Sequence, residues 1–178
     1  MLDGSEGGVP HRVVRTRLAG TRAFDFHGQS VSTVIVLDSA FENGALVEVA
    51  HDYIAQSDAG DVYYFGEDVD IYTNGQITAH TGAWLFGTHT TKLGILMPAK
   101  PVAGQKFRAE DVPGITSEDD EVISTTESVT VPAGTFNNCV RIKEVLSDGA
   151  VEYKVYAAGV GIVQEISEDG SISLRSHR

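Results

Sequence analysis

The chain lacks several features that would identify its chemistry or its compartment. Its 178 residues include a single cysteine, Cys139, which cannot form an internal disulfide, so cysteine usage does not indicate a redox environment. No apolar run approaches the roughly 20 residues that a membrane helix needs. The polar, glycine-rich start, residues 1–11, does not resemble a signal peptide. It reads either as a flexible tail or as a new start that follows a removed export signal.

Positive charge is absent from a long central segment. The formal net charge is -12, and the segment from Ala23 to Thr91 contains ten Asp or Glu residues but no Lys or Arg. A nucleic-acid partner is disfavoured because a polyanion needs a basic footprint, and an anionic membrane surface is disfavoured for the same reason. Cations and neutral or cationic small molecules remain compatible. An acidic surface can also serve solubility alone.

Strand signals fill most of the chain, and helix signals are almost absent. Segments rich in β-branched residues end at turn dipeptides, namely Asn43-Gly44, Asn74-Gly75, Asp148-Gly149 and Asp169-Gly170. Asn-Gly and Asp-Gly favour the type I′ turns that join antiparallel strands, because both central residues need a positive φ. Only residues 117–129 offer a helical alternative, and their β-branched content favours a strand equally.

The predicted strands belong to one fold. We predict an all-β antiparallel meander that forms a closed or nearly closed β-barrel, lipocalin-like in general shape, with little or no helix. Closure would remove the exposed strand edges that invite aggregation. By length, residues 12–178 form a single domain, and residues 1–11 form a flexible tail.

Two polar side chains are predicted to point into the interior. Alternate residues of a strand share a face, and the more apolar face of residues 46–56 carries His51. The apolar face of residues 140–146 carries Glu144, which could meet Lys154 if a bulge shifts the phase of the neighbouring strand. An inward carboxylate is costly unless it finds a partner or a proton, so His51 and Glu144 are candidate catalytic groups. Each also has a purely structural interpretation, as a satisfied core histidine and as an ion-paired or hydrated glutamate.

Acidic residues also gather in one short stretch. The segment from Asp58 to Asp61 does not match the calcium-binding loop of an EF-hand. A looser cation site is predicted from Asp58, Asp61, Glu67 and Asp68, and solvated turn acids are the alternative interpretation. The histidines lack zinc-site spacing, there is no nucleophile elbow, and Cys139 has the surroundings of a small buried hydrophobe.

Aromatic side chains are concentrated in the same part of the chain. Alternation places some of them inside the sheet and others on its outer surface. An interior lined by tyrosine, tryptophan and methionine would suit a flat apolar ligand. The predicted lining residues are Tyr53, Tyr64, Trp84, Phe86 and Met97.

Five stretches of the sequence together resemble a known group of proteins. They are AQSDAGDVYYFGEDVDIYTNG, GAWLFG, MPAKPVAGQKF, VPAGTFNNCVRIKE and VEYKVYAAGVGIV. Their order is similar to the motifs AQD-x-x-G-x-V-x-YFGED, VPAGTF and YAPGVG of an uncharacterised family of bacterial proteins that are mostly predicted to be exported. The chain departs from this pattern at Ala158, where the family has proline. The resemblance implies a β-rich, extracytoplasmic domain, secreted or periplasmic, and it implies no catalytic residue.

Three functions are therefore expected, in order of preference. The first is binding of an apolar or amphipathic small molecule inside the sheet, with His51 and Glu144 as polar anchors. The second is a cofactor-free hydrolase, lyase or cyclase in which His51 or Glu144 acts as the base. The third is Ca²⁺ binding by the acidic stretch. We expect no cofactor, no nucleic-acid partner and no membrane insertion, and the sequence leaves the oligomeric state open.

Overall fold

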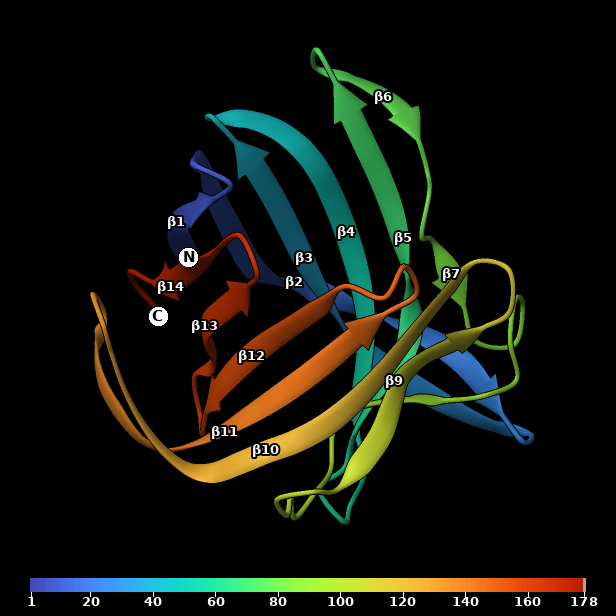
Figure 1. Cartoon of the computed structure of the whole chain (residues 1–178). Helices are drawn as coiled ribbons and strands as arrows, with labels where there is room; N and C mark the ends of the chain where they lie inside the picture. The colour runs from blue at the N-terminus through green and yellow to red at the C-terminus, as the bar shows by residue number, and fades with distance from the viewer. Residues whose placement is uncertain (178) are drawn as a thin grey trace.

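The computed structural model describes residues 1–177 and consists of strands joined by turns and loops (Figure 1). The strands are β1 (Leu2–Glu6), β2 (Val9–Phe26), β3 (Gln29–Glu42), β4 (Ala45–Gln56), β5 (Val62–Thr73), β6 (Gln76–Ala79), β7 (Trp84–Leu85), β8 (Gly94–Met97), β9 (Lys106–Val112), β10 (Thr116–Val131), β11 (Gly134–Leu146), β12 (Val151–Ala157), β13 (Gly161–Ser167) and β14 (Gly170–Leu174). Residues 1–177 contain no helix at all, and hence none that is long and apolar enough to cross a membrane.

All fourteen strands belong to one antiparallel sheet. Hydrogen-bonded neighbours follow the order β6-β5-β4-β3-β2-β1-β14-β13-β12-β11-β10-β9, while β7 and β8 pair with β5. Nearly every neighbour in this path is also a neighbour in sequence, which is what short hairpin connections produce. The predicted all-β antiparallel meander is confirmed. The segment at 117–129, where a helix was the alternative, lies within β10.

The beginning of the chain is not a flexible tail. Residues 2–6 form β1, which pairs with β2 on one side and with β14 on the other. Leu2 lies opposite Leu174, and both side chains are buried. The prediction for residues 1–11 is therefore wrong, because a polar segment is held by backbone pairing with the opposite end of the chain.

Two of the predicted turns have the backbone conformation that their sequence requires. Both residues of Asn43-Gly44 and of Asn74-Gly75 have positive φ values, as a type I′ turn needs. Asp148-Gly149 lies in a longer loop in which only the glycine has a positive φ. The last turn is shifted by one residue, since Gly170 already belongs to β14.

The sheet is strongly curved, but hydrogen bonds do not close it among the described residues. Its terminal strands β6 and β9 do not pair with each other. Instead, β8 pairs with β5 and lies directly against β9, where a side chain at Gly94 would collide with the carbonyl oxygen of Ala109. The gap in the hydrogen-bonded path is thus filled by a short strand and its flanking loops, which surround the interior without completing the ladder (Figure 1).

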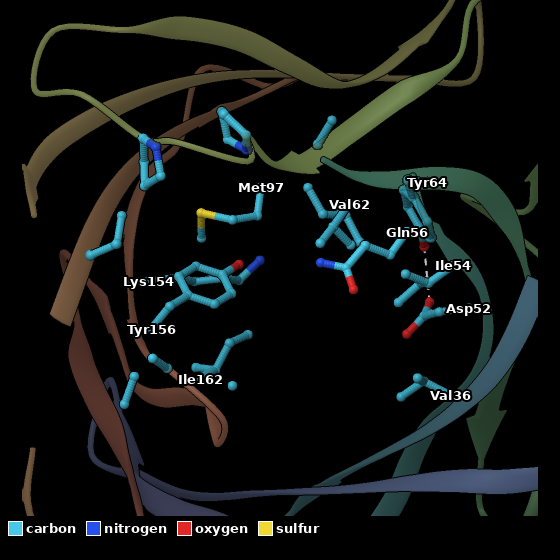
Figure 2. A pocket seen from close by; sticks show the side chains of 18 of the residues that line it. Val36, Asp52, Ile54, Gln56, Val62, Tyr64, Met97, Lys154, Tyr156 and Ile162 are labelled. Carbon is cyan, nitrogen blue, oxygen red and sulfur yellow. Dashed lines mark hydrogen bonds between the residues drawn. The ribbon is translucent and has the colours of Figure 1, made fainter. Parts of the chain in front are cut away.

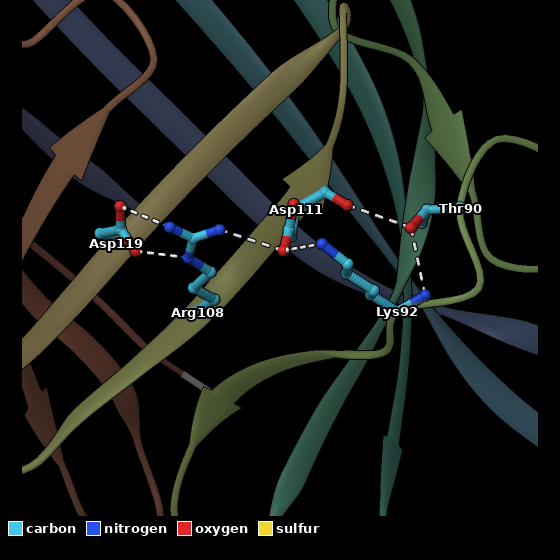
Figure 3. Close-up of polar contacts among 5 residues, drawn as sticks. All are labelled: Thr90, Lys92, Arg108, Asp111 and Asp119. Atoms are coloured by element: carbon cyan, nitrogen blue, oxygen red, sulfur yellow. Dashed lines mark hydrogen bonds and ion pairs between the residues drawn. The ribbon is translucent and has the colours of Figure 1, made fainter.

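Side chains on the outer surface hold this junction together (Figure 3). The hydroxyl of Thr90 donates to the carbonyl oxygen of Asp111 at 3.0 Å, and the Lys92 ammonium lies 2.6 Å from the Asp111 carboxylate. Arg108 contacts the same carboxylate at 3.0 Å and also binds Asp119 on β10. These contacts attach the loop after β7 to strand β9. The positive charges of Lys92 and, to a smaller extent, Arg108 lower the pKa of Asp111.

Apolar side chains form clusters on both sides of the sheet. One aromatic cluster, centred on Phe24, Tyr53, Phe65 and Phe86, covers the outer face of β2 to β5 and lies under the loop after β7. A second cluster lies where the end of the β10–β11 hairpin bends onto β14, with Ala133 donating its amide proton to Leu174 at 3.0 Å. Its buried members are Leu2, Val131, Cys139, Val155, Ala157, Val163, Ile172 and Leu174. The sheet is thereby covered at these two places, and a hollow remains between its curved walls.

Candidate binding cavity

The inward side chains of the curved sheet surround a cavity of about 760 Å³ (Figure 2). A volume of this size is within the range of pockets that hold small organic ligands. Much of the lining is aliphatic or thioether in character. These residues are Val36, Ile54, Val62, Leu96, Met97, Val140 and Ile162.

One wall of the cavity carries a small group of hydrogen-bonding side chains. The hydroxyl of Tyr64 donates to Asp52 Oδ1 at 2.9 Å (Figure 2), and Glu67 lies on β5 opposite Asp52. A bulge in β5 turns both Tyr64 and Glu67 toward the cavity. Burial raises the pKa of Asp52 to about 6, and burial together with the neighbouring Asp52 charge raises the pKa of Glu67 to about 9. At neutral pH Glu67 is therefore a hydrogen-bond donor rather than an anion.

The opposite wall carries Lys154 and Tyr156, which lie on the far side of the cavity from Asp52 in Figure 2. The Lys154 ammonium lies 2.7 Å from Glu144 Oε2. Burial alone would lower the pKa of Lys154, but the Glu144 carboxylate outweighs it and raises that pKa well above its usual value. Lys154 is therefore charged and ion-paired with Glu144.

A second cation at the cavity wall, Arg15, is also ion-paired. Arg15 bonds Asp38 at 2.6 Å on β3 and Glu165 at 2.7 Å on β13, so it links strands on opposite sides of β1 and β14. Among the described residues that line the cavity, Arg15 and Lys154 are the only Lys or Arg residues. A bound anion would have to compete with carboxylates of the protein itself for these two cations.

The predicted ligand-lining residues divide between the two faces of the sheet. Tyr64 and Met97 line the cavity. Trp84 lies opposite Glu67 in the ladder, so it is on the inner face, but it is 1% exposed and does not line the cavity. Its indole N–H bonds Glu110 at 2.9 Å, and its ring is edge-on to Tyr64. The prediction is wrong for Tyr53 and Phe86, which belong to the outer aromatic cluster with Phe24 and Phe65.

His51 and Glu144 do not come together. Glu144 is 1% exposed and faces inward, as predicted, and it meets Lys154 without a bulge because Lys154 lies beside it on the same face. His51 lies opposite Asp68, whose carboxylate binds the outer-face groups Tyr53 and Arg22. The inward residues of β4 are Asp52, Ile54 and Gln56, so alternation places His51 on the outside. The predicted catalytic pair is corrected accordingly.

The four acids of the predicted cation site are also separated. Asp61 accepts the Ala99 amide proton at 2.8 Å and so anchors the loop at residues 98–101, while Asp58 is exposed in a turn. Glu67 faces the cavity, whereas Asp68 is on the outer face. Among residues 1–177 these acids do not converge on a common point.

Most residues of the cavity wall were not among the predicted site residues, and the polar side chains Asp52, Lys154 and Tyr156 are examples. The prediction took the more apolar face of each strand to be the inner one. For β4 this fails because the outer face is itself covered by aromatic side chains, while the inner face lines a partly polar hollow. A usable signal was present in the inward position of Glu144, since antiparallel register then places Lys154 and Tyr156 on the same side.

Comparison of the chain with protein-family models, with curated proteins and with solved structures found no match. The motif resemblance to exported bacterial proteins therefore stays a prediction, and the case for a function depends on the cavity itself.

Proposed function

We propose that this protein binds a neutral or cationic amphipathic small molecule in the cavity, with the curved sheet acting as a nearly closed β-barrel around it. The observation that carries the proposal is a hollow of about 760 Å³ with aliphatic walls and a few convergent polar groups. This combination is typical of ligand sites, where apolar contact provides affinity and the polar groups fix orientation. The resemblance to exported proteins implies that the protein binds this ligand outside the cytoplasm.

The charge of the lining supports this choice of ligand. Carboxyl groups outnumber cations at the wall, and both cations are already ion-paired. The lining carboxyl groups are Asp38, Asp52, Glu67, Glu110 and Glu118. An anionic head group would enter without a free partner, and desolvating an unpaired charge is costly. A cationic or hydroxyl head group would instead find Asp52 and the carboxyl group of Glu67 within the same wall.

Three ligands with the same chain and different head groups test this proposal. We expect decanol and decylammonium to bind in isothermal titration calorimetry, and decanoate to bind at least about tenfold more weakly, because a tenfold ratio needs only about 1.4 kcal/mol of unfavourable charge interaction. Titrations in buffer with EDTA remove any contribution from metal ions. Equal or tighter binding of decanoate would contradict the charge argument, and no binding by any of the three would contradict a role for the cavity.

A substitution that narrows the cavity should weaken binding. Ile162 is an inward residue of β13 on the cavity wall, so Ile162→Trp is expected to reduce decanol affinity by at least about tenfold through loss of space for the ligand. The matched control is Ile77→Trp, since Ile77 on β6 is 49% exposed and lies outside the cavity lining. A folded Ile162→Trp protein with wild-type affinity would place the ligand elsewhere.

A further inference from the structure

Three carboxyl groups meet at a point where β10 and β11 pair. Asp120 lies opposite Glu144 in the ladder, and Glu118 is on the same face two residues earlier in β10. One carboxylate oxygen from each of the three residues lies within 4.8 Å of the others. The side-chain period of two therefore assembles this triad from two adjacent strands, on the inner side of the sheet.

The triad carries more negative charge than its surroundings compensate. Lys154 is the nearby cation, and it lies 2.7 Å from Glu144. When all three carboxyl groups are ionised, the group of four side chains has an excess of two negative charges. Glu152, opposite Glu144, and Glu110, opposite Glu118, add to the negative field, and Tyr156 contributes no positive charge. Either two protons or one divalent cation would balance the excess.

An oxygen of the triad lacks a hydrogen-bond partner. Asp120 is 4% exposed, and its Oδ1 atom is buried without a hydrogen-bond partner. Nearly all buried polar atoms in folded proteins are hydrogen-bonded or bound to an ion, since an unpartnered one is costly. Glu144 Oε2 differs in this respect, because the Lys154 ammonium lies 2.7 Å from it. A buried carboxylate oxygen without a partner, beside two further carboxyl groups, indicates a point that can accept a ligand of positive charge.

We propose that Glu118, Asp120 and Glu144 bind one hard divalent cation of the Ca²⁺, Mg²⁺ and Mn²⁺ class inside the sheet. An all-oxygen donor set selects these ions over softer metals, which prefer nitrogen or sulfur ligands. The spacing also fits, because oxygens on opposite sides of a Ca²⁺ ion are about 4.6–5.2 Å apart and those around the smaller Mg²⁺ are closer. Glu118 lines the cavity, so the ion reaches the triad through it.

Binding of the cation competes with protons on the same oxygens. Burial, together with the neighbouring carboxylates, raises the pKa of Glu118 to about 7 and that of Asp120 to about 9, and the Lys154 charge opposes both shifts. A carboxyl group binds a metal ion in its deprotonated form, so the cation is added at pH 8.

The test is thermal unfolding of the EDTA-treated protein at pH 8, without any organic ligand, with Ca²⁺, Mg²⁺, Mn²⁺ or Zn²⁺ added. Binding to the folded state alone should raise Tm by about 5 °C at saturating concentrations of at least one of the three hard cations, and Zn²⁺ should have a smaller effect. The variant Asp120→Asn should lose most of the shift, since it keeps the shape of the side chain and removes one charged ligand. It should fold, because Asn resembles the protonated carboxyl group.

Asp119→Asn is the matched control. Asp119 is the neighbouring residue of β10, it faces outward, and it binds Arg108 on the surface (Figure 3). This variant should keep the full shift. No shift with any of the three hard cations, or an equal shift in the Asp120→Asn and wild-type proteins, would overturn the proposal. Because no organic ligand is present in this experiment, a negative result would not bear on small-molecule binding in the cavity. The small-molecule titrations are made in EDTA, so a negative result there would not bear on the cation site.

Discussion

Replacing Lys154 with methionine should lower the Tm of the metal-free protein by about 10 °C. Lys154 is the cationic partner of Glu144, which is 1% exposed. Removing one partner of a buried ion pair typically costs about 3–5 kcal/mol, because the other charge stays buried without compensation. For a chain of this length each kcal/mol shifts Tm by about 2–4 °C. Scanning calorimetry in EDTA measures the effect directly.

Two comparisons separate this explanation from a general loss of lysine packing. Lys143 lies on the neighbouring strand and is an outward residue, so Lys143→Met should change Tm little. Adding Glu144→Gln to Lys154→Met should recover part of the lost stability, because the orphaned charge is then removed as well. If Lys154→Met and Lys143→Met unfold at the same temperature, the ion pair contributes nothing to stability, and the charge balance of the interior must be different from the one described.

The fold was predictable from local signals wherever neighbouring strands are joined by short turns. The Asn43-Gly44 and Asn74-Gly75 dipeptides place two hairpins correctly, and the β-branched segments between them become β3, β4 and β5. The pairing of β1 with β14 was not predictable in this way, because it joins residues near the two ends of the chain and leaves no local pattern. The same limit applies to β8, a short strand whose partner is β5.

The candidate site was only half predictable, for a reason that concerns polarity. Inferring the inner face from apolar content works when the inside of a sheet is a dry core and the outside is in water. Here the outside of β4 is covered by aromatic side chains and the inside lines a hollow with carboxyl groups, so the rule places His51 and Tyr53 on the wrong face. It succeeds for Glu144 because its neighbours Val140 and Ile142 are apolar and inward.

This inverted polarity has a thermodynamic consequence for the whole molecule. Carboxyl groups held in the interior are less easily ionised than in the unfolded chain, and Glu67, Asp120, Glu118 and Asp52 all have raised pKa values. Each of these groups keeps a proton in the folded protein over a pH range in which the unfolded chain has already lost it. The folded state therefore binds more protons, and its stability must fall as pH rises through that range.

Raising the pH from 5 to 9 in EDTA should accordingly destabilise the protein, and Glu67→Gln should remove a distinct part of this loss. The pKa of Glu67 rises from 4.5 in an ordinary environment to about 9, so its contribution to stability is complete below about pH 4.5 and decreases up to about pH 9. Between its two pKa values, a single group of this kind lowers the free energy of unfolding by about 1.4 kcal/mol for each pH unit, which corresponds to about 4 °C in Tm. Glutamine resembles the protonated carboxyl group and has no proton to lose. The variant should therefore match the wild-type protein near pH 5 and be more stable at pH 8 to 9.

Asp68→Asn is the control for this pH profile. Asp68 follows Glu67 in β5 but lies on the outer face with Arg22 and Tyr53, so its removal should lower Tm slightly and leave the slope against pH unchanged. Differential scanning fluorimetry of the three proteins across the pH range gives the comparison. Parallel profiles for Glu67→Gln and wild type would mean that Glu67 ionises freely in the folded state. In that case the wall beside Asp52 and Tyr64 is wet and charged, and a purely cationic ligand would be favoured over a neutral one.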